Sequence, residues 1–124
     1  MSQKIIKNFA HFFVEISQLV YSQVFIVLTV VGNGLIGFSG TIFYFLEKDL
    51  NPNLHYIDAI WWSFATATTT GYGDITPKTF AGKFLGILLM LAGTAIFAMY
   101  TGLFAETILK SEYLKRDTRE KNRH

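Results

Sequence analysis

Two long stretches without charged residues dominate the pattern of hydrophobic and polar positions. The first covers residues 16–46, and the second covers residues 84–105 between Lys83 and Glu106. About 20 consecutive apolar residues are enough for a helix to cross a bilayer. The pattern therefore predicts two membrane-spanning helices, an outer one over about 22–46 and an inner one over about 84–109.

Residues 3–20 have the periodicity of an amphipathic helix, with polar and apolar residues on opposite faces. A strongly apolar face opposite a lysine-bearing face is typical of a helix that lies in the membrane interface. We expect residues 1–21 to form such an interfacial helix, with packing on a soluble partner as the alternative. The polar face holds Lys4, Lys7, Asn8, His11, Glu15 and Gln18, and the apolar face holds Ile5, Phe9, Phe12, Phe13, Ile16, Leu19 and Val20.

The segment between the spans predicts a re-entrant loop. After a polar loop over residues 47–55, residues 56–67 read as a helix about 18 Å long at about 1.5 Å per residue, which is too short to cross a membrane. The stretch 69–73, if extended, covers about 16 Å at about 3.3 Å per residue. The helix that would enter the membrane and the extended stretch that would return to the same side thus have matched lengths. Asp58 in the first turn complements the helix dipole.

The stretch Thr-Ala-Thr-Thr-Thr-Gly-Tyr-Gly-Asp at 66–74 begins in the last two residues of this short helix and continues beyond it. Carbonyls of an ordinary strand alternate in direction, so aiming consecutive ones at one axis needs residues that accept a positive φ, as glycine does. Gly71 and Gly73 alternate here with Thr70 and Tyr72. A ring of such loops would present oxygens that replace the water around a cation, and Thr69 would add a hydroxyl.

This stretch resembles the selectivity filter of potassium channels, T-x-T-T-x-G-Y-G-D, the standard example of ion coordination by rings of backbone carbonyls. The resemblance implies a homotetramer in a lipid bilayer, because one loop supplies a quarter of each ring. It also implies K⁺ as the permeant ion, with no cofactor. The implied ion-binding residues are Thr69, Thr70, Gly71 and Tyr72 through their carbonyls, the Thr69 hydroxyl, and Gly73 at the end of the stretch.

The resemblance further implies residues that support the filter. Trp61 would donate its indole N–H to Asp74, and Trp62 would pack near Tyr72. Gly93 corresponds to the hinge glycine of the family's inner helix, with simple helix packing as the alternative. At helical spacing beyond it, the implied inner-mouth residues are Thr101, Ala105 and Leu109.

The chain departs from the family pattern at two positions. Thr70 stands where Val or Ile is usual, and its hydroxyl needs a partner that Val does not need. Ala65 stands where some relatives carry a Glu paired with the filter aspartate, so that carboxyl pair cannot form. The Thr70 departure bears on the gating stability of the filter and leaves the carbonyl stack intact.

The distribution of Lys and Arg predicts the orientation, because cytoplasmic segments carry their excess. The loop between the spans holds Lys48, Lys78 and Lys83, against eight such residues at the two ends. We therefore expect a multi-pass protein of the cell membrane with both termini in the cytoplasm. Residues 110–124 form a charged cytoplasmic tail that continues the inner helix or frays, with the pairs Glu112/Arg116 and Asp117/Lys121.

Composition agrees with these elements. Hydrophobic residues make up 51% of the chain and charged residues 16%, which favours a membrane protein. The absence of cysteine excludes disulfides and thiolate metal sites. A net charge of +2 gives no reason to expect nucleic acid as a partner. The expectation is an all-α membrane protein with two transmembrane helices, a re-entrant pore helix and a filter loop, acting as a potassium channel subunit and not as an enzyme.

Three alternatives remain. One is a weakly selective cation channel, which Tyr72 argues against, and another is the pore fragment of a larger gated channel. The third is a nucleotide-binding enzyme, since Gly32–Gly37 matches G-x-G-x-x-G after the strand-like residues 24–31. No further βα units follow, so we assign these glycines to helix packing, where a polar Asn33 can hydrogen-bond across helices.

Overall fold

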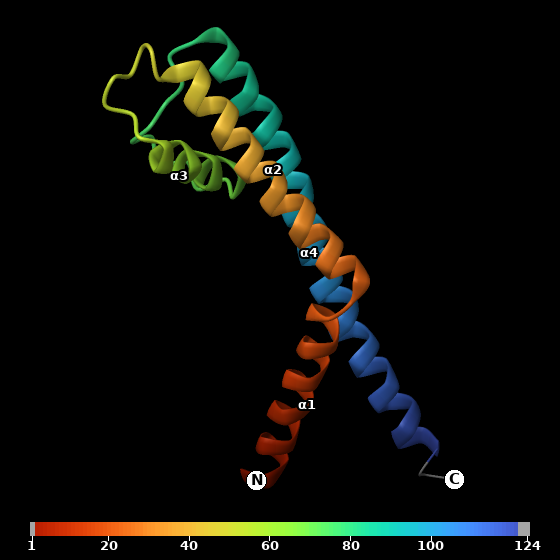
Figure 1. The fold of residues 1–124 in the computed structure, drawn as a ribbon. Coiled ribbons are helices and arrows are strands. Elements are labelled where there is room, and N and C mark those ends of the chain that lie inside the picture. Colours follow the sequence, from red (N-terminus) through yellow and green to blue (C-terminus); the bar gives the residue numbers. More distant parts are fainter. Residues whose placement is uncertain (1, 122–124) are drawn as a thin grey trace. The chain divides into compact units, whose positions relative to one another are not determined.

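The computed structural model of the chain describes residues 2–121 and contains four helices over that range (Figure 1). No strand occurs between residues 2 and 121. The structure has two helices that are long and apolar enough to cross a membrane. The fold is therefore that of an all-α membrane protein with two spanning helices, as the sequence predicts. The helices are α1 (Ser2–Val20), α2 (Gln23–Glu47), α3 (Tyr56–Ala67) and α4 (Phe80–Lys121), of which α2 and the Phe80–Lys110 part of α4 are the candidate spans.

Parts of two predicted segments lie outside the described residues. These are Met1 of the predicted interfacial segment and residues 122–124 of the predicted tail. The side chains of residues 2–9 and 11 are likewise outside the description, as are those of residues 111, 114, 115 and 117–121. Most of the predicted polar face of the first helix and the pair Asp117/Lys121 therefore stay predictions.

A short break separates α1 from α2, although the charge-free pattern runs through it. Ser22 is the N-cap residue of α2, because its Oγ accepts a hydrogen bond from the Phe25 N–H at 3.2 Å. A serine in this position satisfies an N–H group that the first turn of a helix leaves unpaired. The Tyr21 N–H donates to the Ser17 carbonyl oxygen at 3.1 Å and closes α1. The two helices are thus delimited by local hydrogen bonds that hydrophobicity does not reveal.

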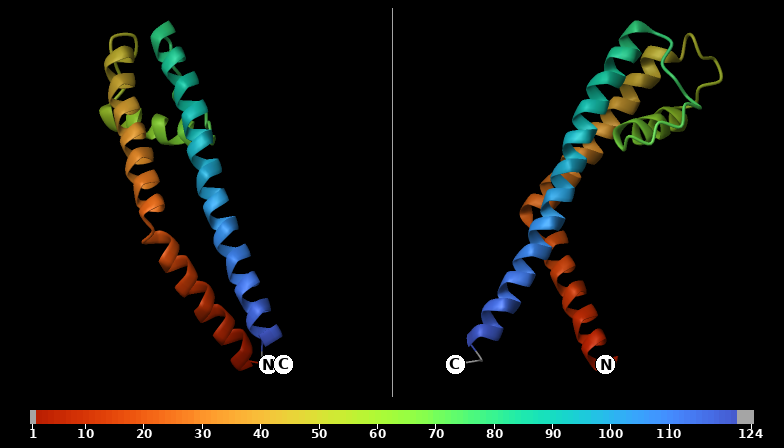
Figure 2. Two further views of the ribbon diagram at one scale, coloured as in Figure 1. Left: turned by 90° about the vertical axis from the view of Figure 1, so that its right-hand side faces the viewer. Right: turned by 180° about the vertical axis from the view of Figure 1, so that it is seen from behind.

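The chain divides into two compact units, one of Leu28–Ala98 and one of Met1–Val27 with Met99–His124. In the first unit, α2 and α4 run antiparallel and α3 lies to one side of the pair (Figure 2). The segments before and after α3 both lead to the end where α2 stops and α4 starts (Figures 1 and 2). The chain between the spans therefore enters and leaves from the same end, which is the arrangement of a re-entrant loop.

Aromatic packing anchors α3 against the spans. Phe43 of α2 is fully buried, and its ring stacks on that of Trp62 with the centroids 3.7 Å apart. Gly40 allows the close approach, because a Cβ there would come within 3.1 Å of the Ala59 carbonyl oxygen. Leu89 of α4 belongs to the same buried cluster. α3 is thus held by side chains from both spanning helices.

The first turn of α3 is fixed by two polar contacts. Thr41 Oγ1 donates to the Gly37 carbonyl oxygen at 2.8 Å and lies 2.8 Å from the Tyr56 hydroxyl. Since the Thr41 proton is already given to a carbonyl, the Tyr56 hydroxyl is the donor of the second bond. Asp58 Oδ2 accepts the His55 N–H at 2.9 Å. The start of α3 is therefore tied both to α2 and to its own preceding residue.

The glycine-rich match at Gly32–Gly37 lies inside α2, as do the strand-like residues 24–31. A dinucleotide fingerprint needs a strand immediately before its glycines. Because these residues are helical, the fingerprint lacks its structural context and the enzyme alternative falls.

The packing role predicted for these glycines holds for Gly32, which is buried and whose Cβ would lie 3.5 Å from Ile96 of α4. Gly34 and Gly37 have open space where a Cβ would be. Asn33 donates its amide N–H at 2.9 Å to the Thr29 carbonyl oxygen of its own helix.

In the second unit, Phe25 packs edge-on against two aromatic rings of α4. Its ring centroid lies 5.2 Å from that of Tyr100 and 6.3 Å from that of Phe104. On α1, Phe12 and Phe13 from the predicted apolar face are 47% and 63% exposed. A helix that presents phenylalanines outward has an apolar surface for a membrane or another partner to cover.

Candidate functional site

The backbone over 69–73 has an alternating conformation. φ is +60° at Thr69, +56° at Gly71 and +76° at Gly73, with no other positive φ among the described residues. The two glycines have the positive φ that the sequence predicts. Thr69 was missed, because a β-branched residue rarely adopts this conformation and gives no sign of it in the sequence. Reversing the sign of φ at every second residue turns successive peptide planes, so their carbonyls need not alternate as in a strand.

The C-terminal end of α3 holds this conformation in place. A helix leaves its last four carbonyls without partners inside the helix. Here the carbonyl oxygens of Phe64, Ala65 and Thr66 accept the N–H groups of Thr68, Gly71 and Thr69 at 3.0, 3.0 and 3.1 Å, respectively. Backbone in a sparsely populated region persists only when its surroundings determine it. These three hydrogen bonds hold the backbone in its alternating conformation.

One of these bonds also sets the direction of a carbonyl. The Thr70 carbonyl and the Gly71 N–H belong to the same peptide plane, and no described peptide bond is cis. In a planar trans peptide the C=O and N–H bonds point in opposite directions. Because the Gly71 N–H points to the Ala65 carbonyl of α3, the Thr70 carbonyl points away from α3. The Thr69 N–H bond to Thr66 turns the Thr68 carbonyl away from α3 in the same manner.

Trp61 joins α3 to the far end of the stretch. Its Nε1 donates to Asp74 Oδ2 at 2.9 Å, the hydrogen bond that the family resemblance implies. Its ring also stacks on that of Tyr72, with centroids 5.4 Å apart and planes 9° from parallel. The expectation that Trp62 packs near Tyr72 is not met within one chain, since Trp62 stacks on Phe43 instead. The side chains of Tyr72 and Asp74, at the far end of the stretch, are thus fixed to α3 through Trp61.

The Thr70 hydroxyl has a partner, which answers the question that its place in the filter pattern raises. Thr70 Oγ1 lies 2.9 Å from Thr68 Oγ1. Thr68 Oγ1 in turn donates to the Phe64 carbonyl oxygen at 2.7 Å. Both hydroxyls therefore face the end of α3.

Glu47 is a residue that sequence reasoning missed. It was assigned to the polar loop, yet it ends α2 and is fully buried. Its carboxylate accepts the N–H groups of Lys78 and Thr79, both at 2.9 Å, and the Thr79 hydroxyl at 2.6 Å. Asn51 Nδ2 donates to it at 3.3 Å. The buried carboxylate thereby ties the end of α2 to the segment that leads into α4.

Two residues at the start of α4, Thr79 and Gly82, pack tightly around Glu47. Thr79 Oγ1 accepts the Gly82 N–H at 2.8 Å and so caps the first turn of α4. A Cβ on Gly82 would collide with Glu47 Oε1. The only signals for this arrangement in the sequence are a Glu at the end of an apolar run and a Thr-x-x-Gly before the next one, and neither is specific.

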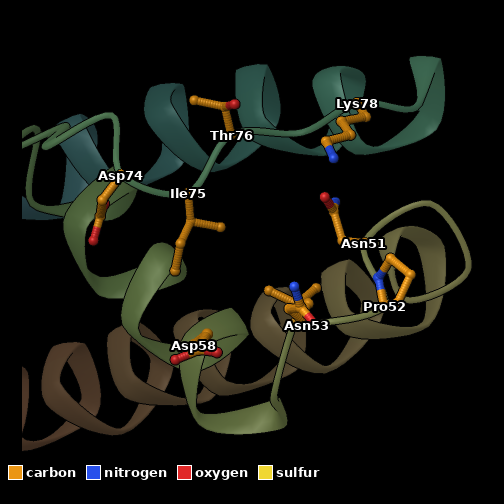
Figure 3. Close-up of a pocket in the computed structure, with 9 residues that line it drawn as sticks. Asn51, Pro52, Asn53, Asp58, Asp74, Ile75, Thr76 and Lys78 are labelled. Atoms are coloured by element: carbon orange, nitrogen blue, oxygen red, sulfur yellow. The ribbon is translucent and has the colours of Figure 1, made fainter.

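An open hollow of about 580 Å³ lies beside Asp74, at the end of the unit where α2 stops and α4 starts (Figure 3). Figure 3 shows Asp58 and Asp74 on one side of it, with Lys78 and Asn51 across from them. No group of three His, Cys, Asp or Glu side chains suited to a metal ion occurs in the part of the chain that the structure describes. The remaining lining residues are Pro52, Asn53, Leu54, Ile75 and Thr76.

Gly93 lies against the end of α3. It is buried, and a Cβ on it would collide with the Ala67 carbonyl oxygen and come within 2.7 Å of the Ala67 Cα. Only a residue without a side chain lets the α4 backbone touch α3 so closely, so Gly93 has a packing function at Ala67, the last residue of α3. Further along α4, which is helical throughout, the predicted inner-mouth residues Thr101, Ala105 and Leu109 are exposed.

Comparisons with known proteins agree with this arrangement. A protein-family model described as "Ion channel" matches residues 33–110. The chain is 41% identical over 64 residues to a cyclic nucleotide-gated potassium channel of Rhizobium etli, covering 50% of this chain and 18% of that protein. It is 36% identical over 84 residues to the human potassium voltage-gated channel subfamily KQT member 4, covering 67% of this chain and 12% of that protein. A crystal structure of a voltage-gated K⁺ channel pore domain, in a closed state in lipid membranes, aligns with a TM-score of 0.56 at 35% identity, over 64% of this chain and 88% of that one.

The chain belongs to the ion channel family whose model matches it over 33–110. It is a membrane-integral protein of a family of channels and not of enzymes. It spans less than a fifth of the length of the curated relatives named above, and most of the solved pore domain.

Proposed function

We propose that the chain is a subunit of a potassium-selective channel and conducts K⁺ passively across the membrane. The carbonyls of Thr69, Thr70, Gly71 and Tyr72 and the Thr69 hydroxyl coordinate the ion, and Gly73 ends the coordinating stretch. The observation that carries the proposal is the alternation of positive φ at Thr69, Gly71 and Gly73, with the Thr70 carbonyl directed away from α3. Rings of backbone carbonyls that replace the hydration shell are the known means of coordinating K⁺ in a filter.

The working unit in this proposal is a homotetramer in the lipid bilayer. A single chain offers one carbonyl at each level of the stretch, and a dehydrated cation needs oxygens on all sides. Tyr72 is 65% exposed in the isolated chain, and residues 68–74 are all exposed. Filter backbone at membrane depth is tolerated only where protein or a water-filled cavity surrounds it. Three further copies supply that surrounding.

The residues around the stretch have supporting functions in this proposal. Trp61, through Asp74 and Tyr72, braces the outer end of the filter, and Trp62 braces α3 against α2. Gly93 is a candidate hinge as well as a packing residue. The inner mouth is lined by Thr101, Ala105 and Leu109, and K⁺ is the only bound species required.

The proposed orientation places both termini in the cytoplasm, with α1 in the membrane interface and residues 110–124 as a charged cytoplasmic tail. Eight of the eleven Lys and Arg residues lie outside the loop between the spans, which supports it. The exposed Phe12 and Phe13 on α1 support the interfacial position. Accessibility of single cysteines introduced near each end, in sealed right-side-out vesicles, tests the orientation.

The test of function is the reversal potential of the reconstituted protein in a planar bilayer, with K⁺ on one side and Na⁺ on the other. A selective channel gives a reversal potential close to the K⁺ equilibrium potential. A reversal potential near zero supports the weakly selective cation channel, and no current from a protein that is tetrameric in mild detergent contradicts the proposal.

A further inference from the structure

Thr70 occupies a filter position where the family resemblance leads one to expect Val or Ile, so its hydroxyl is the distinctive group of this stretch. The structure pairs that hydroxyl with Thr68, the two Oγ1 atoms lying 2.9 Å apart. Thr68 Oγ1 also lies 2.7 Å from the Phe64 carbonyl oxygen and 3.5 Å from that of Ala65. Two hydroxyls and the end of α3 thus form one connected group.

The chemistry of these groups fixes the direction of the protons. A hydroxyl has one proton to donate and two lone pairs, and a carbonyl oxygen only accepts. The Thr68 proton goes to the Phe64 carbonyl, the shorter of its two carbonyl contacts. The 2.9 Å contact is therefore a bond from the Thr70 hydroxyl to Thr68 Oγ1. Consecutive hydrogen bonds of this kind polarise and strengthen one another.

We call these two consecutive hydrogen bonds, from Thr70 to Thr68 and from Thr68 to the Phe64 carbonyl oxygen, the hydroxyl relay. The relay acts on the peptide plane that carries the Thr70 carbonyl. That plane is held on one side by the Gly71 N–H bond to the Ala65 carbonyl of α3 at 3.0 Å. Rotating the plane breaks this bond and turns the Thr70 carbonyl toward α3 and away from the ion path. A Thr70 side chain bonded to α3 through Thr68 opposes the rotation, because the side chain and the plane share the same Cα.

We propose that Thr70 is a positioning residue of the ion path, whose hydroxyl, through Thr68 and the Phe64 carbonyl, holds the Thr70–Gly71 peptide plane in its conducting orientation. A valine there has the same shape but no proton to donate, so the plane is then held by one bond and not two. The inference rests on the proposed function, because the ion path is itself part of that proposal.

The test compares four variants of the full chain in planar bilayers: Thr70→Val, Thr70→Ser, Thr68→Val, and the double variant Thr68→Val/Thr70→Val. Two quantities are measured. The first is the rate of inactivation, which is the loss of current during sustained activity. The second is the K⁺ concentration at which the conductance falls to half of its maximum. Thr70→Val loses current about five to ten times faster and needs more K⁺, since a net hydrogen bond is worth about that factor. Thr70→Ser keeps the hydroxyl, so its current loss and K⁺ dependence change much less than those of Thr70→Val.

The remaining variants test the relay itself. Thr68→Val reproduces the effect of Thr70→Val, and the double variant is no worse than Thr68→Val alone, because both remove the same chain of bonds. The reversal potential of Thr68→Val, a residue outside the proposed ion ligands, stays at its original value. A merely structural contribution changes the thermal stability of the tetramer without shifting the K⁺ dependence.

Several results overturn the inference. These are a Thr70→Val channel with unaltered current loss and K⁺ dependence, a Thr70→Ser channel as impaired as Thr70→Val, and strictly additive effects in the double variant. If Thr70→Val fails to assemble, a Thr68→Val channel with unchanged current loss and unchanged K⁺ dependence still overturns the inference. If the unaltered protein shows no K⁺ preference, the proposed function fails and the inference with it. If it selects K⁺ and the variants match it, only the inference fails.

Discussion

The segment between the two spans is held at its two ends by different kinds of contact. At the end of α3, the N–H groups of Thr68, Thr69 and Gly71 bond to carbonyls only three to six positions earlier. At the start of α4, Lys78 and Thr79 bond to Glu47, 31 and 32 positions away. The first set shapes a strained stretch of backbone, whereas the second fixes where that stretch sits in the fold. Changes at the first end should therefore abolish conduction without unfolding, and changes at the second should lower stability.

Gly71→Ala is the change with the largest expected effect, and it isolates the first end. A Cβ in the left-handed region costs about 1–2 kcal/mol per residue, which is multiplied in a tetramer. We expect K⁺ current to fall by at least about a hundredfold while the tetramer still forms. Single-channel recording together with size-exclusion chromatography coupled to light scattering checks both parts. Gly34→Ala, where a Cβ meets open space within the chain, is the matched control and should conduct.

Glu47→Gln tests the second end. An amide has roughly the shape of the carboxylate, but it has lost the charge and presents N–H donors to the N–H groups of Lys78 and Thr79. Hydrogen bonds to a charged group contribute about 1.5–3 kcal/mol, so we expect a lower melting temperature of the tetramer. Glu106→Gln, at an exposed Glu of α4, is the control and should leave the melting temperature unchanged. Equal melting temperatures for Glu47→Gln and the unaltered protein would show that the buried carboxylate does not hold the two helices together.

Gly93→Ala distinguishes packing from a hinge. Because the new Cβ would collide with the Ala67 backbone, we expect about 1–3 kcal/mol of lost stability, the usual cost of overpacking. The contact lies just before the filter stretch, so open probability should fall as well, while selectivity of the channels that conduct is kept. Thermal unfolding and single-channel recording on the same preparation test this. If Gly93→Ala changes the open probability but unfolds at the same temperature as the unaltered protein, the packing function is contradicted and only the hinge function remains.

Trp61→Phe has the smallest expected effect. It keeps an aromatic ring to stack on Tyr72 but removes the N–H that bonds to Asp74. The loss corresponds to one exposed hydrogen bond, about 1 kcal/mol, so current during sustained activity should decay a fewfold faster at unchanged selectivity. Asp74→Asn, which leaves an amide oxygen as acceptor for the Trp61 N–H, should have a weaker effect than Trp61→Phe. The reverse order would show that the Asp74 carboxylate acts through something other than its bond from Trp61.

Local features explain what could be predicted from the sequence. The two spans follow from long charge-free runs, and the short helix over Tyr56–Ala67 lies where its length and flanking residues place it. The positive φ at Gly71 and Gly73 follows from the residue type. The Trp61 bond to Asp74 came from the family resemblance, because nothing local indicates it.

What the sequence did not reveal depends on distant or tertiary contacts. Glu47 was taken for a loop residue, because its partners lie more than 30 positions away along the chain. The positive φ of Thr69 is imposed by the end of α3 against the preference of a β-branched residue. The close contact of Gly93 with Ala67 likewise exists only once α3 has folded back against α4.

The central claim is that ions bind between the carbonyls of residues 69–72 at the axis of a tetramer. The most direct measurement is crystallographic: crystals grown in Tl⁺ in place of K⁺, with anomalous difference maps collected near the thallium absorption edge. The account predicts anomalous peaks on the fourfold axis, between the successive carbonyls of Thr69, Thr70, Gly71 and Tyr72, with the innermost peak between the Thr69 carbonyl and the Thr69 hydroxyl. Well-ordered filter residues with no peak on the axis, or with peaks only elsewhere in the protein, would contradict it.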